Sequence, residues 1–121
     1  MMRRTFMVVT LVFGLLVASA GAAQAWDLIH DRSGEGRVTL RAWTRGYGQV
    51  AYLADHAHTR VSVDVHVECG DGSTFDRSWT DGGAHFRFIL RGLRDRGRCN
   101  HTFKVVANDP DAELDLYLYA R

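Results

Sequence analysis

Two histidines separated by one residue are the first feature of this sequence that could do chemistry. His56 and His58 stand in the run Asp55-His56-Ala57-His58, and residues at i and i+2 of an extended chain share one face. Imidazole nitrogens are common ligands of zinc and copper, which here would need a third ligand from another strand. The candidates for that ligand are His66, His85, His101 and Asp64. The alternative, which we favour, is a polar loop between two strands, so metal binding is the weaker hypothesis.

Four arginines, Arg91, Arg94, Arg96 and Arg98, form a second candidate site. Guanidinium groups bind phosphate, sulfate and carboxylate in a bidentate manner, so this segment could hold an anion or an acidic partner. The alternative is a solvated loop whose charge is balanced by acidic residues that follow it in the chain. Those residues are Asp109, Asp111, Glu113 and Asp115. We favour charge balance, because solvated charge runs are common on protein surfaces.

Three aromatic residues, Trp43, Tyr117 and Tyr119, are out of phase with the apolar residues of their own segments. A strand period therefore places their rings on outward faces. Aromatic rings with polar tips are frequent in protein interfaces. We expect a partner-binding surface here, with at least two of the three rings exposed and close together. The alternative is that the rings cover the sheet as cross-strand neighbours.

Catalytic motifs are missing from the sequence. It has no Gly-x-Ser-x-Gly elbow, no His-Glu-x-x-His helix, no phosphate loop and no dinucleotide fingerprint. We therefore expect no catalytic residues and no cofactor, and we interpret the protein as a non-enzymatic binding or interaction module. A periplasmic metal-binding protein that uses His56 and His58, and an enzyme of unrecognised type, are the two alternatives.

The elements that must position these residues are β-strands, because apolar and polar residues alternate through most of the chain. The clearest case is Thr59 to Cys69, where Val61, Val63, Val65 and Val67 share a face. The other expected strands are Arg37 to Trp43, Tyr47 to Ala54, Ser73 to Trp79, Ala84 to Arg91, Cys99 to Ala107 and Ala112 to Ala120, with Trp26 to His30 as a weaker one. Turn residues separate them, among them Ser33 to Gly36 and Gly70 to Ser73. Seven or eight such strands predict an all-β fold, a small antiparallel β-sandwich of the immunoglobulin-like kind.

The two cysteines, Cys69 and Cys99, are the only pair in the chain. Cys69 shares its parity with the inward valines, and Cys99 shares its parity with Phe103 and Val105. We expect a disulfide between them, buried between the sheets. Closing a loop of this length stabilises a small domain by roughly 3 to 4 kcal/mol in the chain-entropy model.

The N-terminus predicts export. Arg3 and Arg4 precede an apolar run that is too short to span a bilayer and ends in small residues at Ala23-Gln24-Ala25. We expect residues 1–25 to be a cleaved signal peptide and residues 26–121 to be one β-sandwich domain. The arginine pair also resembles a twin-arginine signal, although the general secretory route is favoured. Either route leads to the periplasm or the outside of the cell.

The expected mature domain is nearly neutral. It has 13 basic and 14 acidic residues, which gives a formal charge of −1. This balance excludes nucleic-acid binding by bulk charge and general adhesion to anionic membranes. We expect a protein or another envelope component as the partner, and no membrane anchor after cleavage.

The histidine pair generates a first prediction. Because a polar loop is favoured over a metal centre, neither Zn(II) nor Cu(II) should bind with micromolar affinity at His56 and His58. Calorimetry on the tag-free mature protein measures this. A micromolar site that disappears in His56→Ala would reverse the order of the two hypotheses.

Overall fold

The computed structural model describes residues 25–121, which form eight β-strands and no helix. The expected signal peptide lies outside the described residues, apart from Ala25. The strands are β1 Asp27–Glu35, β2 Arg37–Arg45, β3 Gln49–Asp55, β4 Val61–Cys69, β5 Thr74–Asp81, β6 His85–Arg91, β7 Arg98–Ala107 and β8 Glu113–Ala120. In this part of the chain, therefore, no helix could span a membrane.

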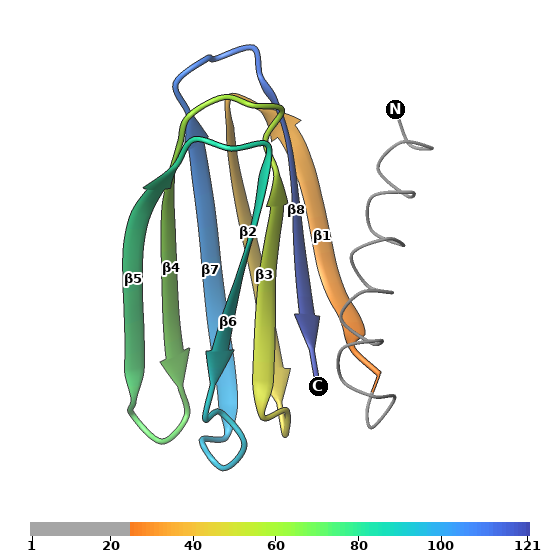
Figure 1. Cartoon of the computed structure of the whole chain (residues 1–121). Coiled ribbons are helices and arrows are strands. Elements are labelled where there is room, and N and C mark those ends of the chain that lie inside the picture. Colours follow the sequence, from red (N-terminus) through yellow and green to blue (C-terminus); the bar gives the residue numbers. More distant parts are fainter. Residues whose placement is uncertain (1–24) are drawn as a thin grey trace.

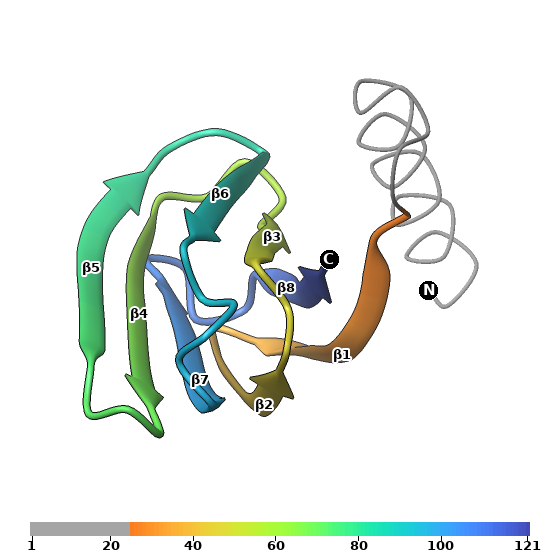
Figure 2. The same cartoon turned by 90° about the horizontal axis from the view of Figure 1, so that it is seen from below.

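The strands form two four-stranded sheets that face each other (Figures 1 and 2). Their orders are β1-β8-β3-β6 and β2-β7-β4-β5, and all pairings are antiparallel. The pairs β4·β5, β3·β6, β2·β7 and β1·β8 are nested around the turn between β4 and β5. This is the order of an eight-stranded jelly roll. The predicted all-β sandwich is confirmed, whereas the strand order differs from that of an immunoglobulin domain, which groups sequential strands differently.

The first strand is longer than the sequence predicts. The expected turn from Ser33 to Gly36 is reduced to Gly36, and Ser33 and Gly34 are paired with Asp115 and Leu114 of β8. The extension is possible because β8 can pair with β1 along its whole length. This pairing outweighs the local turn preference of Ser33 and Gly34. A register shift between Leu28 and His30 marks a bulge near the start of β1.

The core lies between the sheets and follows the predicted alternation. The four inward valines of β4 are buried and belong to the main hydrophobic cluster. In β8, Leu114, Leu116 and Leu118 belong to the same cluster. These inner faces provide most of the free energy that holds the two sheets together, at about 25 cal/mol per Å² of apolar surface buried.

The disulfide between Cys69 and Cys99 is present and buried, as expected. It joins β4 to its neighbour β7, where the two cysteines are directly opposite in the register. It therefore cross-links two strands of one sheet on its inner face and does not tie one sheet to the other. The sheets are held together by side-chain packing.

The two long sides of the sandwich are closed differently. Between β5 and β6, Trp79 packs against Phe86 and Phe88 with ring centroids 5.4 and 5.2 Å apart. These rings fill the space between the two edge strands. Between β1 and β2, no comparable aromatic cluster is found among the described residues, and an open groove remains.

The chain crosses from one sheet to the other at Gly36, between β1 and β2. Its φ of 71° is in the left-handed region, which glycine adopts without steric cost. A Cβ at this position would lie 2.5 Å from the carbonyl oxygen of Pro110. Gly36 also donates to Ala112 O and accepts from Ala107 N at 2.9 and 2.7 Å. The crossing therefore requires a residue without a side chain.

Replacement of this glycine should lower the free energy of unfolding by a measurable amount. Gly36→Ala should destabilise the fold by about 2 to 4 kcal/mol, because backbone strain adds to an overlap with Pro110 that cannot relax. Gly72→Ala is the control, since Gly72 has a φ of 89° but a Cβ there would have no atom within 4 Å. Urea denaturation measures both variants. Equal losses would show that the contact with Pro110 is unimportant.

Candidate functional site

Only one of the three predicted outward aromatic residues is exposed. Trp43, on β2, has 53% of its surface accessible, whereas Tyr117 and Tyr119 are 3% and 2% accessible. The two tyrosines do lie outside the main core, as their parity predicts. They belong to a second cluster of buried residues, which includes Ala51 and Leu53 of β3, the residues opposite them in the register. The expectation of a patch formed by these three rings is therefore wrong.

Trp43 is held on the outer face of the sheet β2-β7-β4-β5 by its neighbours. It lies opposite Asn100 of β7, and the guanidinium carbon of Arg98 is 4.2 Å from its ring centroid. Such a cation–π contact orients the ring and covers part of it. The indole is thus a rigid, exposed apolar group on a strand.

A groove of about 510 Å³ lies beside Trp43, between β1 and β2. One wall is the run Arg41–Arg45 of β2, and the other includes His30 and Ile29 of β1. Tyr47 also lines the groove, and its hydroxyl donates to Asp27 Oδ2 at 3.1 Å. Burial and this hydrogen bond raise the pKa of Tyr47. The groove combines an aromatic anchor with two arginines, a pairing that is typical of binding sites.

Neither Arg41 nor Arg45 is neutralised. The four ion pairs of residues 25–121 involve His56, His66 and Arg96 as cations, and none reaches the arginines of β2. Both side chains are exposed. The groove therefore offers positive charge to a ligand.

The histidine pair is not brought together as a metal site. His56 is fully buried, with Nδ1 2.7 Å from Thr59 O and Nε2 2.8 Å from Asp81 Oδ2, whereas His58 is exposed. Ala57 and His58 have φ values of 53° and 64°. This left-handed turn removes the extended geometry that would place both rings on one face. In residues 25–121, no group of three or more His, Cys, Asp or Glu side chains is arranged so that it could hold a metal ion.

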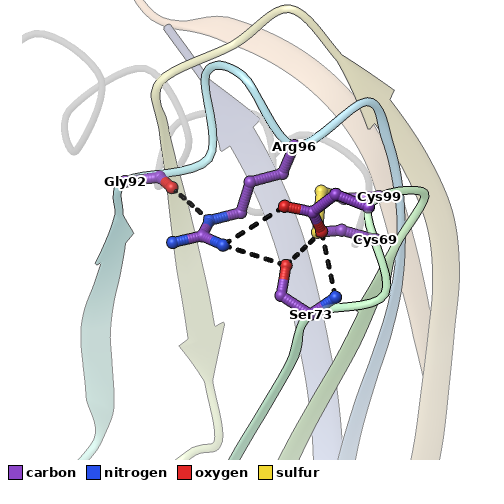
Figure 3. A network of polar contacts seen from close by, with 6 residues as sticks. Cys69, Ser73, Gly92, Arg96 and Cys99 are labelled. Carbon is purple, nitrogen blue, oxygen red and sulfur yellow. Dashed lines mark hydrogen bonds and ion pairs between the residues drawn. A yellow bond between two sulfur atoms is a disulfide. The ribbon is translucent and has the colours of Figure 1, made fainter.

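The four arginines between the end of β6 and the start of β7 do not converge on one anion site. Arg94 donates to Gly46 O at 3.2 Å, Arg98 stacks on Trp43, and Arg91 is exposed at the end of β6. Arg96 donates to Gly92 O at 2.7 Å, to Ser73 Oγ at 3.0 Å and to Asp71 Oδ2 at 3.3 Å (Figure 3). Arg96 thus stabilises the turn between β4 and β5, next to the disulfide.

One arginine of this segment has an acidic partner from another part of the chain. The carboxylate that Arg96 contacts is that of Asp71, from the turn after Cys69. Hydrogen bonds from Ser73, together with the charge of Arg96, lower the pKa of Asp71. No local pattern signals this pairing, because the turn and the arginine segment are distant in the chain.

A polar cluster on the outer face of β4 and β5 was not singled out from the sequence. His66 Nε2 is 2.9 Å from Glu68 Oε2, and His66 Nδ1 is 2.5 Å from Asp76 Oδ1. The hydrogen bonds to Glu68 and Asp76 raise the pKa of His66. The cluster is exposed on a sheet face, so it can bind protons, but it is not enclosed by a cavity.

Sequence reasoning also missed a hydrogen-bonded relay inside the core. His101 Nδ1 is 2.7 Å from the Tyr52 hydroxyl, and His101 Nε2 is 2.8 Å from Thr44 Oγ1. Burial lowers the pKa of His101 to about 4 and raises that of Tyr52. Both ring nitrogens of a neutral imidazole between two hydroxyls have a hydrogen-bond partner, since each hydroxyl can donate or accept. The relay bridges the two sheets without introducing charge.

No family model matches the sequence, and no curated protein matches it. Among solved structures, the TmCBM61 module in complex with β-1,4-galactotriose is 15% identical, with a TM-score of 0.49 over 80% of this chain and 68% of that one. The C-terminal domain of A223, a structural protein from sulfolobus turreted icosahedral virus, is 9% identical, with a TM-score of 0.49 over 79% and 98%. The Yersinia pseudotuberculosis-derived mitogen is 7% identical, with a TM-score of 0.48 over 76% and 85%. At these values, no ligand or activity is carried over.

The relay predicts how stability depends on pH. The folded-state pKa of His101 is about 4, below the ordinary 6.5, so the unfolded chain binds the proton first as pH falls. Stability should therefore decrease between pH 6.5 and 4, by up to about 3 kcal/mol from this group. His66 acts in the opposite direction, because its raised pKa adds stability at low pH that is lost as pH rises through the folded value.

Urea denaturation at several pH values, on the wild type and on His101→Asn, separates these contributions. The wild type should lose stability more steeply than His101→Asn over this range. Parallel curves would mean that His101 titrates normally. His66→Asn, measured in the same way, reports the opposing contribution.

Proposed function

We propose that this protein is a non-enzymatic binding module that works outside the cytoplasm and holds an acidic ligand in the groove between β1 and β2. The observation that carries the proposal is the exposed indole of Trp43 beside Arg41 and Arg45, which have no acidic partner among the described residues. A large exposed ring and unpaired guanidinium groups both gain free energy when a ligand covers them.

The site is rigid before a ligand binds. Arg41, Trp43 and Arg45 share the outer face of β2, which is fixed by its full ladder with β7. Residues at this spacing are about 7 Å apart along a strand. A preorganised site loses little conformational entropy on binding, and this increases affinity.

An exported location is supported by the disulfide and by the N-terminal sequence. A buried Cys69–Cys99 bond is typical of proteins that fold in an oxidising compartment. The expected signal peptide of residues 1–25 has the same implication. The proposed place of action is therefore the periplasm or the cell exterior.

A non-enzymatic role is supported by the places of the titratable groups. The two histidine sites with carboxylate partners, His56 with Asp81 and His66 with Glu68 and Asp76, lie in a buried corner and on a sheet face. Neither histidine lines the groove, and His30, which does line it, has no carboxylate partner among the ion pairs of residues 25–121. A catalytic acid or base has to be within hydrogen-bond reach of the bound substrate.

The proposal predicts that Trp43→Ala weakens binding. Two acidic probes are suitable, an oligogalacturonide and a blocked peptide of alternating Glu and Val, each added at millimolar concentration to the isotope-labelled mature protein. At least one probe should shift the amide signals of Arg41–Arg45 saturably. Trp43→Ala should reduce its affinity about tenfold, which corresponds to about 1.4 kcal/mol.

Leu28→Ala is the matched control, because Leu28 is the other large apolar residue that is exposed in residues 25–121 and it does not line the groove. This variant should bind like the wild type. The proposal is wrong if neither probe shifts the β2 signals, or if Trp43→Ala binds with unchanged affinity.

A further inference from the structure

We infer that the ligand of this groove is an extended acidic peptide, which pairs as an added strand with the free edge of β2. The inference rests on the proposed function and names the class of its ligand. It depends on the backbone of β2 as well as on its side chains.

The groove runs along the edge of β2. Its wall contains every residue from Arg41 to Arg45, although the side chains of Ala42 and Thr44 point to the opposite face from those of their neighbours. Consecutive residues of a strand can line one groove only if the groove borders the backbone edge. The space beside this edge is therefore accessible to another chain.

That edge has no partner strand. In residues 25–121, β2 is paired only with β7, and β1 across the groove is paired only with β8. Every second residue of an edge strand directs its N–H and C=O away from its neighbour, which is a template for an added strand. Five residues of β2 span roughly 17 Å. This length accommodates about five residues of an extended peptide.

The edges on the other side of the molecule are less suitable. There, the rings of Trp79, Phe86 and Phe88 occupy the space between β5 and β6. The β5 strand also carries acidic residues, Asp76 and Asp81, along its length. On this side, therefore, the filled space disfavours an added strand, and on β5 the two carboxylates also disfavour an acidic peptide.

Charge selects the side chains of the peptide. Arg41 and Arg45 flank Trp43 on the outer face of β2, and Arg98 lies over the indole. Two acidic residues of β1 are close to the lining residues in the sequence: Asp27 already accepts the hydroxyl of Tyr47, and the charge of Asp31 acts on Tyr119. A peptide with a carboxylate at every second position would place those groups near the arginines, since residues opposite each other in a sheet share a face.

A peptide also matches the backbone better than an acidic saccharide does. The free edge presents N–H and C=O groups with a repeat of about 7 Å, and only another peptide strand carries the complementary groups at the same repeat. A saccharide could bind the arginines and stack on Trp43, but it would leave most of these backbone groups to water.

The experiment compares a blocked peptide of about seven residues, alternating Glu and Val, with the matching Lys and Val peptide and with an oligogalacturonide. Two further Glu peptides carry backbone N-methyl groups, one at the Glu positions and the other at the Val positions. Affinities for the mature protein are measured by calorimetry. Only every second N–H group of the bound peptide faces β2. One N-methylated peptide should therefore lose affinity at least tenfold, while the other retains it.

The protein variants test the charge. Arg41→Gln with Arg45→Gln should weaken the Glu peptide at least tenfold. Arg87→Gln with Arg91→Gln is the matched control, since these exposed arginines have the same spacing on the edge strand β6. That double variant should bind like the wild type, and the Lys peptide should bind at least tenfold more weakly than the Glu peptide.

Each other outcome overturns the inference in a recognisable way. Equal binding of both N-methylated peptides would exclude strand pairing. Binding of the oligogalacturonide without the peptide would leave the proposed function intact and make the ligand a saccharide. A dimer in sedimentation velocity that the β2 double variant dissociates would make the occupant a second copy of this chain. If neither probe binds, both the inference and the proposed function are wrong.

Discussion

Burial of one face of each sheet is the constraint on which the rest of this structure depends. The strands are paired as a nested hairpin around the β4–β5 turn, and such a hairpin has to fold over on itself before its apolar face leaves water. The chain therefore crosses between the sheets repeatedly. One of these crossings is at Gly36, where the close approach of Pro110 leaves no space for a side chain. The same crossing makes β1 and β2 the two edge strands on one side of the sandwich.

The two sides of the sandwich illustrate how local composition decides whether a fold closes or stays open. Aromatic rings from β5 and β6 fill one side. On the opposite side, Trp43 lies on the outer face of β2, and no pair of rings bridges β1 and β2 among the described residues, so no comparable aromatic cluster closes the groove. An open edge exposes unpaired backbone groups and is a risk for aggregation unless it is charged. Arg41 and Arg45 supply that charge, and the proposed function assigns ligand binding to the same two side chains.

The buried histidines among the described residues have hydrogen-bond partners for both ring nitrogens. His101 is neutral between Tyr52 and Thr44, and His56 is held by Thr59 and Asp81 at the corner between β3 and β4. The Arg96 network secures the turn beside the disulfide (Figure 3). These contacts stabilise the scaffold, because a buried polar group without a partner would cost about 1 to 3 kcal/mol. The groove is different in that its arginines have no carboxylate partner among the described residues.

The sequence by itself determined the secondary structure, the inward face of most strands and the disulfide, because alternation with a period of two is a local property and only two cysteines are present. It also placed Trp43 outward. Only the tertiary structure decided the jelly-roll order, the burial of Tyr117 and Tyr119 and the separation of His56 from His58. Alternation gives the face of a residue but not which strands flank it, so it cannot distinguish a central strand such as β8 from an edge strand such as β2. The burial of His56 against Asp81, a residue distant in the chain, is likewise recorded by no local pattern.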